Sequence, residues 1–177
     1  MRPRLTDFLL GSVAGLLAAL AVWLSATGTE QFSMYIVSAA VGLIVLLLGS
    51  VWCGWQKVLG RPAYPVALGA IAILALLVSV SVKQWPLRIT YSVSRSAFNA
   101  TAQRVREGQK MTFPQRIGLF TIRKAEVSHT GVVCLWTRPA ASGNTGFVQC
   151  NRESAPVSFN LWSMVKLDDG WQFISED

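Results

Sequence analysis

Three long runs without a charged side chain constrain the fold of this chain more than any other feature. They cover residues 8–29, 31–56 and 62–82. A helix needs about 20 mostly apolar residues to cross a bilayer, and each run is long enough. One charge at the centre of such a helix would cost roughly 2.5–3.5 kcal/mol on insertion. The runs therefore predict three transmembrane helices, at about residues 8–27, 33–53 and 63–82.

Charged residues divide the chain into two halves. Residues 1–82 carry six charged side chains, and residues 83–177 carry nineteen. The first half lacks the polar shell that three buried helices of a soluble protein would need, whereas the second half has an ordinary water-facing composition. We therefore predict a transmembrane domain over residues 1–82 and a separate soluble domain over residues 83–177.

The first run must be distinguished from a cleaved signal peptide. Signal sequences have an apolar core of about 7–15 residues, and a small-residue cleavage site follows it. The first run is longer than that, and no clear cleavage site follows it. An uncleaved first span is therefore the favoured interpretation.

Basic residues near the spans give the expected orientation, because Lys and Arg favour the cytoplasmic side. An N-terminus in the cytoplasm places four basic residues on that side. Lys83, Arg88 and Arg95 favour the opposite orientation, but large domains cross membranes largely regardless of charge. The sequence thus predicts a multi-pass protein of the cell membrane with an extracytoplasmic C-terminal domain.

Two cysteines of the C-terminal half support the same orientation. Cys134 and Cys150 lie in apolar segments that look like two strands joined by a loop rich in turn residues. A disulfide between them would add about 3 kcal/mol and would persist only outside the cytoplasm. The alternative is two buried thiols without a bond between them.

Small residues four positions apart occur in all three apolar runs, and such pairs let helix backbones approach closely in lipid. The pairs are Gly11 and Gly15, Ser38 and Gly42, and Ala75 and Ser79. They predict a compact helix bundle to which a partner helix could be added. The runs contain no Asp, Glu, Lys, Arg or His, although ion-coupled transport generally needs intramembrane charge. An independent transporter is therefore disfavoured.

The C-terminal half reads as an α+β domain. Residues 87–93 alternate like a strand, and a helix follows from Ser94 or Ser96 up to Gly108. Five further strands are predicted at residues 117–128, 132–137, 147–151, 160–167 and 171–175. Asp168-Asp169-Gly170 joins the last two as a hairpin turn. The predicted order is strand, helix and antiparallel β-meander.

Residue types that carry chemistry are sparse. His129 is the only histidine, so a multi-histidine metal site is excluded, and its position suggests an exposed turn residue rather than a general base. Asp168 and Asp169 fit a tight turn better than a calcium site. Glycine-rich phosphate loops and CxxC pairs are absent. We therefore expect neither a metal nor a cofactor.

A group of basic residues is the remaining candidate for binding. Its members are Arg104, Arg106, Arg116, Arg123 and Lys124. Such residues gain about 1 kcal/mol each near an anionic membrane surface, and they could equally contact an acidic partner protein. The alternative is an ordinary solvated surface. Nucleic acid is not expected as a ligand of an extracytoplasmic domain.

Three segments resemble a group of bacterial membrane proteins of uncharacterised activity. They are Leu87 to Phe98, Arg116 to Ile122, and Gly146-Phe-Val. The resemblance covers about half of the chain and implies N-terminal spans followed by a domain of this kind. It implies no activity and assigns no functional residues.

Together these features predict a non-catalytic, membrane-anchored binding or accessory module, or a small subunit of a larger membrane complex. Its expected partners are the lipid bilayer and either a membrane protein or an anionic lipid. The alternative is a cell-envelope enzyme whose active site carries no known motif.

Overall fold

The computed structural model describes residues 5–28, 31–58, 60, 62, 64–128, 131–140, 143–149 and 161–176. Contacts divide the chain into two compact units. The N-terminal unit comprises Met1–Ser25 and Ser33–Trp85. The C-terminal unit comprises Ala26–Phe32 and Pro86–Asp177. The boundary after Trp85 lies beside the position near Lys83 at which the sequence predicts it, but the segment Ala26–Phe32 was not expected in the C-terminal unit.

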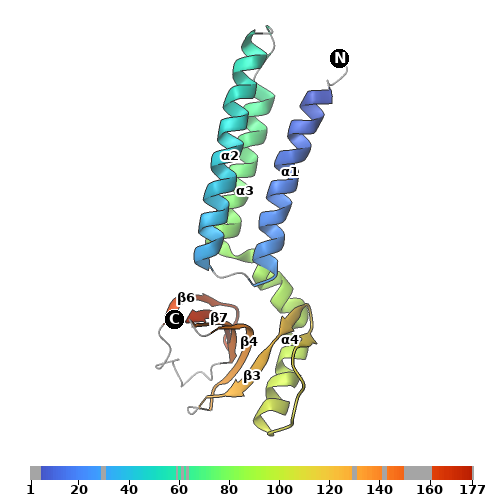
Figure 1. Ribbon diagram of the computed structural model, residues 1–177, viewed down its shortest axis with the longest axis vertical. Coiled ribbons are helices and arrows are strands. Elements are labelled where there is room, and N and C mark those ends of the chain that lie inside the picture. Colours follow the sequence, from blue (N-terminus) through green and yellow to red (C-terminus); the bar gives the residue numbers. More distant parts are fainter. Residues whose placement is uncertain are drawn as a thin grey trace. The chain divides into compact units, whose positions relative to one another are not determined.

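Three helices form the N-terminal unit (Figure 1): α1 (Leu5–Ala26), α2 (Gln31–Val58) and α3 (Tyr64–Lys83). Of the described helices, α2 alone is long and apolar enough to be a candidate span by itself, over Ser33–Val58. The segments Ala67–Lys83 and Trp85–Arg106 meet the same criteria only as a bent pair. Length and composition therefore identify one candidate span near the N-terminus, whereas the sequence predicts three.

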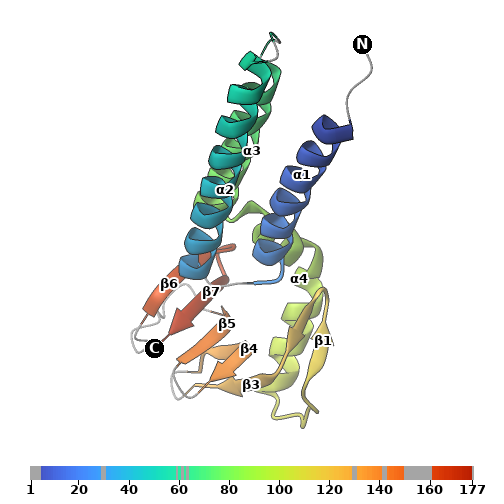
Figure 2. The same cartoon turned by 45° about the horizontal axis from the view of Figure 1, so that its top comes forward.

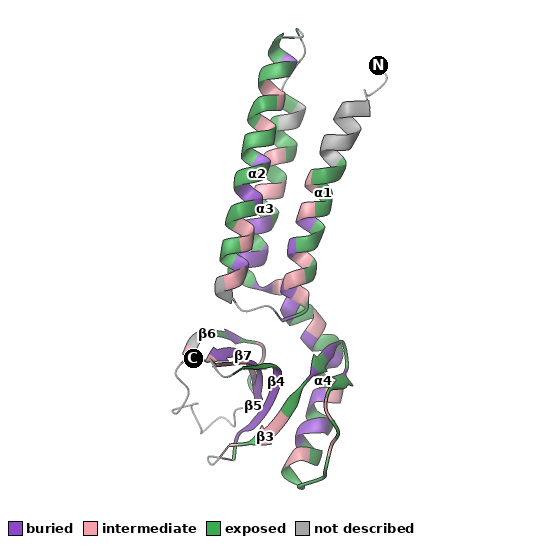
Figure 3. Ribbon diagram, in the orientation of Figure 1, coloured by how far each residue is buried: buried purple, intermediate pink, exposed green. Residues whose placement is uncertain are grey.

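Apolar side chains and a pair of serine hydroxyls lie between these helices. Ala21, Val41, Val45 and Leu77 form a buried cluster. The Ser81 hydroxyl donates a hydrogen bond of 2.5 Å to the Ser38 hydroxyl. Most of the other described residues of α2 and α3 are exposed (Figure 3).

Helix α4 (Trp85–Arg106) opens the C-terminal unit, and it corrects the strand predicted over residues 87–93. Leu87, Tyr91 and Phe98 are fully buried at helical spacing, whereas Ile89 and Val93 are exposed. The alternation of apolar residues at positions 87, 89, 91 and 93 suggested a strand. The longer 3.6-residue period, which continues to Ala102, decides in favour of the helix.

Local signals explain where α4 begins and ends. Pro86 occupies the first turn, where proline is favoured because its missing N–H is not needed. Gln84 separates α3 from α4 and has a φ of 48°, which interrupts a continuous helix. Gly108, with a φ of 70°, follows the C-terminus of α4 as a left-handed cap. The predicted end is therefore confirmed, but the helix begins at Trp85, about two and a half turns before Ser94 and three turns before Ser96.

The single strand predicted over residues 117–128 is three short strands. They are β1 (Gln115–Ile117), β2 (Phe120–Ile122) and β3 (Lys124–Val127). β1 and β2 form a hairpin whose turn contains Gly118, with a φ of 58°. A β-carbon at position 118 would collide with Ser94 on α4. The glycine thus lets the hairpin turn pack directly against the helix.

The main sheet has five antiparallel strands in the order β3-β4-β5-β7-β6. The strands not yet introduced are β4 (Val133–Ala140), β5 (Gly143–Gln149), β6 (Leu161–Lys166) and β7 (Trp171–Glu176). β7 pairs with both β5 and β6. This order corrects the predicted meander, in which β6 would lie next to β5. The predicted hairpin at Asp168-Asp169-Gly170 is confirmed.

Helix α4 lies along one face of this sheet (Figures 1 and 2). Aromatic side chains from both elements and from the β1–β2 hairpin form the main core. Phe98, Phe147, Phe173 and Trp171 are among its buried members. A second buried cluster on the opposite face contains Cys134, Trp136, Val148 and Ile174. An α+β unit is therefore observed, with a helix and a hairpin covering the main core.

Candidate functional site

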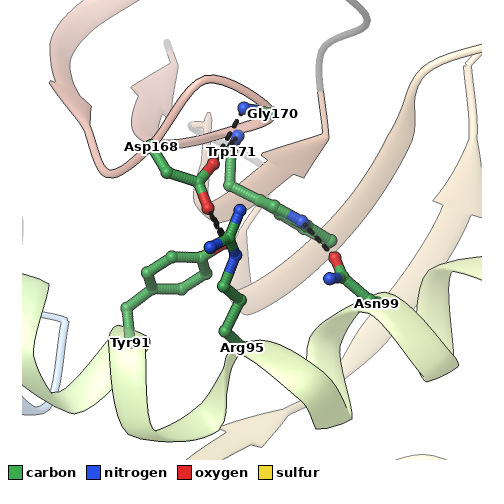
Figure 4. A network of polar contacts seen from close by, with 6 residues as sticks. All are labelled: Tyr91, Arg95, Asn99, Asp168, Gly170 and Trp171. Atoms are coloured by element: carbon green, nitrogen blue, oxygen red, sulfur yellow. Dashed lines mark hydrogen bonds and ion pairs between the residues drawn. The ribbon is translucent and has the colours of Figure 1, made fainter.

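A polar network among the described residues of the C-terminal unit is centred on Asp168 (Figure 4). Asp168 lies between β6 and β7, where its carboxylate atom Oδ1 accepts hydrogen bonds from the backbone N–H groups of Gly170 and Trp171, both at 2.8 Å. Its second oxygen, Oδ2, accepts the Tyr91 hydroxyl at 2.8 Å and lies 3.0 Å from Arg95 Nε. The network therefore joins a hairpin turn to α4.

Asp168 is saturated as an acceptor. A carboxylate has about four lone-pair sites, and the four contacts occupy both oxygens. The contacts come from charged, hydroxyl and backbone donors. The arrangement is therefore suited to holding the turn on the helix.

Tyr91 is the group whose ionisation this network alters most. Burial raises the pKa of the Tyr91 phenol well above its usual value near 10, and the hydrogen bond and charge of Asp168 raise it further. Arg95 opposes part of this effect. The phenol consequently stays protonated and acts as a hydrogen-bond donor.

The raised pKa of Tyr91 predicts a loss of stability at alkaline pH. The folded protein keeps the phenol proton at pH values at which the unfolded chain releases it. This contribution is complete below about pH 10 and declines above it, by at most about 1.4 kcal/mol per pH unit. Denaturant unfolding of the detergent-solubilised chain between about pH 8 and pH 11 should show this decline. The Tyr91→Phe variant should show a smaller one, and equal slopes would contradict the assignment.

A second contact between α4 and the hairpin supports the same structural role. The Trp171 indole N–H donates a hydrogen bond of 2.9 Å to the Asn99 side-chain oxygen (Figure 4). Tyr91, Arg95 and Asn99 thus lie four residues apart on one side of α4 and face the turn. We call this group, with Asp168 and Trp171, the α4–turn network.

The other described carboxylates of the C-terminal unit are also engaged locally. Burial alone would raise the pKa of Glu126, but hydrogen bonds from Lys124 and Trp136 outweigh it and hold that pKa below its usual value. Asp169 pairs with Lys166, Glu176 accepts from Asn144, and Glu107 accepts from glutamines. These acids therefore serve as local structural acceptors.

The five predicted basic residues are all exposed, but they lie on different segments. Arg104 and Arg106 end α4, and Arg106 donates to the Gln149 side chain at 2.7 Å. Arg116 on β1 contacts the Gly118 carbonyl, and Lys124 is 2.7 Å from Glu126. Arg123 lies between β2 and β3. Several of these cations therefore have structural contacts, and their role as one binding patch stays a prediction.

The predicted disulfide and the predicted histidine turn involve residues outside the described part of the chain. Cys134 lies on β4, where its partner on β5 is Val148. Cys150 and His129 fall outside the described residues. The disulfide therefore stays a prediction. Among the described residues, no group of three or more His, Cys, Asp and Glu is placed to hold a metal ion.

The small-residue pairs predicted for helix packing have different surroundings. A β-carbon at Gly42 would lie 3.3 Å from Leu74 on α3. The Ser38 hydroxyl accepts a hydrogen bond from Ser81, which is also on α3. A β-carbon at Gly15 would have no neighbour within 4 Å among the atoms compared. The side-chain surroundings of Gly11 are not described. Ser38 and Gly42 thus lie at the α2–α3 contact.

The sequence analysis did not predict an exposed apolar group that lies on α4 and the β1–β2 turn. Ile89, Val93 and Leu119 are 55%, 68% and 52% exposed. Ile89 and Val93 are one helical turn apart, and the Leu119 amide donates to Ser94, the neighbour of Val93. Assigning residues 87–93 to a strand hid the group, whereas a helical reading would have placed Ile89 and Val93 together. We call these three residues the outer apolar group.

Comparison of the chain with protein-family models, with curated proteins and with solved structures finds no match. The resemblance to bacterial membrane proteins therefore gains no support from these comparisons.

Proposed function

We propose that this chain is a three-span membrane protein whose C-terminal unit acts outside the cytoplasm as a non-catalytic binding or accessory module. Helices α1, α2 and α3 are the proposed spans, with the N-terminus in the cytoplasm. The function of the membrane half is to hold the C-terminal unit at the bilayer.

The polarity of the N-terminal unit carries this proposal. Leu47 and Val51 of α2 are 58% and 73% exposed, whereas Ser25 and Gln84 are 0% and 1% exposed. Ser25 donates to the Gln84 side-chain oxygen at 3.1 Å, and Gln84 donates to the Ser81 carbonyl. A helix in water hides its apolar residues and exposes its polar ones. The reverse distribution, with hydrogen-bonded polar groups inside, fits a bundle surrounded by lipid.

The position of the segment between α1 and α2 supports an even number of membrane crossings between this segment and the C-terminal strands. Ala26–Phe32 belongs to the C-terminal unit, and a β-carbon at Gly28 would lie 3.2 Å from the Phe173 ring. If α2 crossed the bilayer and α3 did not, Gly28 and Phe173 would lie on opposite sides of the membrane. Their proximity therefore favours crossing by both helices, with α1 as the additional span.

The distribution of charge supports binding rather than catalysis by the C-terminal unit. Its described carboxylates are held in the local contacts given above. Arg88, Arg104, Lys110, Arg123 and Arg138 are exposed. A unit with internally engaged acids and outward cations presents a positive surface, which is suited to anionic headgroups or an acidic partner.

Two epitope positions distinguish three spans from one. One tag is inserted at Gly60, between α2 and α3, and another is added after Asp177. Three spans place the Gly60 tag in the cytoplasm and the C-terminal tag outside. Protease added to intact spheroplasts should therefore remove only the C-terminal tag, and permeabilisation should expose both.

The alternative gives a different result, because a single crossing by α2 places both tags on the same side. Equal protection of the two tags would overturn the three-span topology. Release of the untagged chain from membranes by alkaline carbonate would overturn membrane integration itself.

A further inference from the structure

The outer apolar group forms an exposed apolar surface on the C-terminal unit. Its three side chains lie on one turn of α4 and on the adjoining β1–β2 turn, and each is at least half exposed. The hydrogen bond from the Leu119 amide to Ser94 Oγ measures 3.0 Å, and the Ser94 hydroxyl itself donates to the Thr90 carbonyl at 2.9 Å. The hairpin turn is thus fixed to the helix, and the group has a defined arrangement.

We propose that the outer apolar group inserts into the outer surface of the bilayer and that Arg88 and Arg116 contact anionic lipid headgroups beside it. The proposal rests on the proposed membrane anchoring and deepens it by naming the surface that the C-terminal unit binds. Apolar side chains flanked by arginines are the residues that interfacial helices use to bind anionic membranes.

Chain connectivity favours the bilayer as the occupant. Ile89 is only six residues beyond the last residue of α3. Even a fully extended chain of that length spans only about 20 Å. The group is therefore tethered close to the membrane end of α3 whatever the orientation of the C-terminal unit. This tether raises the local concentration of the bilayer surface far above that of a diffusing partner.

Charge complementarity supports the same occupant. Arg88 adjoins Ile89 on α4, and both are exposed. Arg116 lies on the strand that leads into the turn of Leu119, where its Nε contacts the Gly118 carbonyl at 3.3 Å. This contact uses one donor of a guanidinium that has five N–H groups. Both cations can therefore reach headgroup phosphates while the apolar side chains enter the interface.

The test is photo-crosslinking of the full-length chain in nanodiscs that contain anionic lipid. Benzophenone-alanine replaces Val93 or Leu119, and it replaces Met164 as a matched control. Met164 is also about half exposed, but it lies on edge strand β6. Lipid adducts at positions 93 and 119 should exceed those at 164 roughly tenfold, the ratio that burial of one valine side chain implies.

A second comparison tests the headgroup contact. The Arg88→Gln change should reduce the adduct at position 93 roughly fivefold on anionic lipid and leave it unchanged on neutral lipid. Lys166→Gln, which removes an exposed cation from edge strand β6, is the matched control and should have no effect. Each variant is used only if its thermal unfolding midpoint matches that of the unsubstituted protein.

Benzophenone-alanine at Leu47 on α2 separates the two proposals. Lipid adducts at position 47 without an excess at 93 and 119 would overturn this inference and leave the membrane anchor intact. A protein adduct in native membranes at position 93 in place of lipid would also overturn it. Absence of lipid adducts at position 47 would contradict the anchor as well.

Discussion

Replacing Phe147 with alanine is expected to lower the free energy of unfolding of the C-terminal unit by about 3–5 kcal/mol. Phe147 is fully buried on β5. Its ring centroid lies 4.6 Å from that of Phe98, 4.7 Å from that of Phe120 and 5.0 Å from that of Phe173. The side chain therefore contacts the helix, the hairpin and the sheet at once, and no single neighbour can move to fill the cavity.

Denaturant unfolding of the detergent-solubilised chain, followed by near-ultraviolet circular dichroism, measures this effect. Native domains have a total stability of only about 5–15 kcal/mol, so the variant should also become sensitive to limited proteolysis. Met164→Ala is the matched control, because it truncates an exposed apolar side chain and should change stability by less than about 0.5 kcal/mol. Equal effects of the two changes would contradict the position of Phe147 at the centre of the core.

The second large effect is expected at Asp168, whose removal should cost about 3 kcal/mol. The Asp168→Ala change leaves the Tyr91 hydroxyl buried without its acceptor and removes the acceptor of two backbone N–H groups in the turn. The contribution of Arg95 is smaller, because its side chain is 60% exposed and water screens the ion pair. Most of the lost stability should therefore come from the neutral donors left without an acceptor, which are the Tyr91 hydroxyl and the two backbone N–H groups.

The neighbouring carboxylate provides the control for this prediction. Asp169 is 73% exposed and forms an ion pair with Lys166, so Asp169→Ala should cost less than about 1 kcal/mol. In the double variant Asp168→Ala with Tyr91→Phe, part of the loss should be recovered, because the stranded hydroxyl is gone. Strictly additive losses in chemical denaturation would argue against a direct coupling of Tyr91 with Asp168.

Local sequence signals predicted the parts of the fold that depend on neighbouring residues. Asp168-Asp169-Gly170 identified its hairpin because this turn chemistry acts over three residues. Gly108 likewise predicted the end of α4. Gly118, which has a positive φ and divides the predicted strand at residues 117–128, was overlooked inside an apolar stretch. A glycine there could have signalled the break.

Long-range partners account for what the sequence could not predict. Residues 87–93 fit a strand when read alone, and only the continuation to Phe98 and Ala102 identifies the helix. Tyr91 and Asp168 are 77 positions apart, so no local pattern joins them. The pairing of β7 between β5 and β6 depends on the complete sheet rather than on either strand. The structure therefore identifies the α4–turn network and the strand order, whereas local sequence patterns could not predict them.

The packing of Gly28 has a consequence for how this protein comes to be folded. Phe173 and Phe120 lie against the segment that contains Gly28, although Phe173 comes 145 positions later in the chain. Ribosomes add about 5–20 residues per second, so residue 28 must wait for those 145 residues before Phe173 exists. A fragment cut at Pro86 would therefore keep every strand and still leave two phenylalanines uncovered. In the purified fragment, residues 86–177 should have a lower free energy of unfolding than they have in the intact chain.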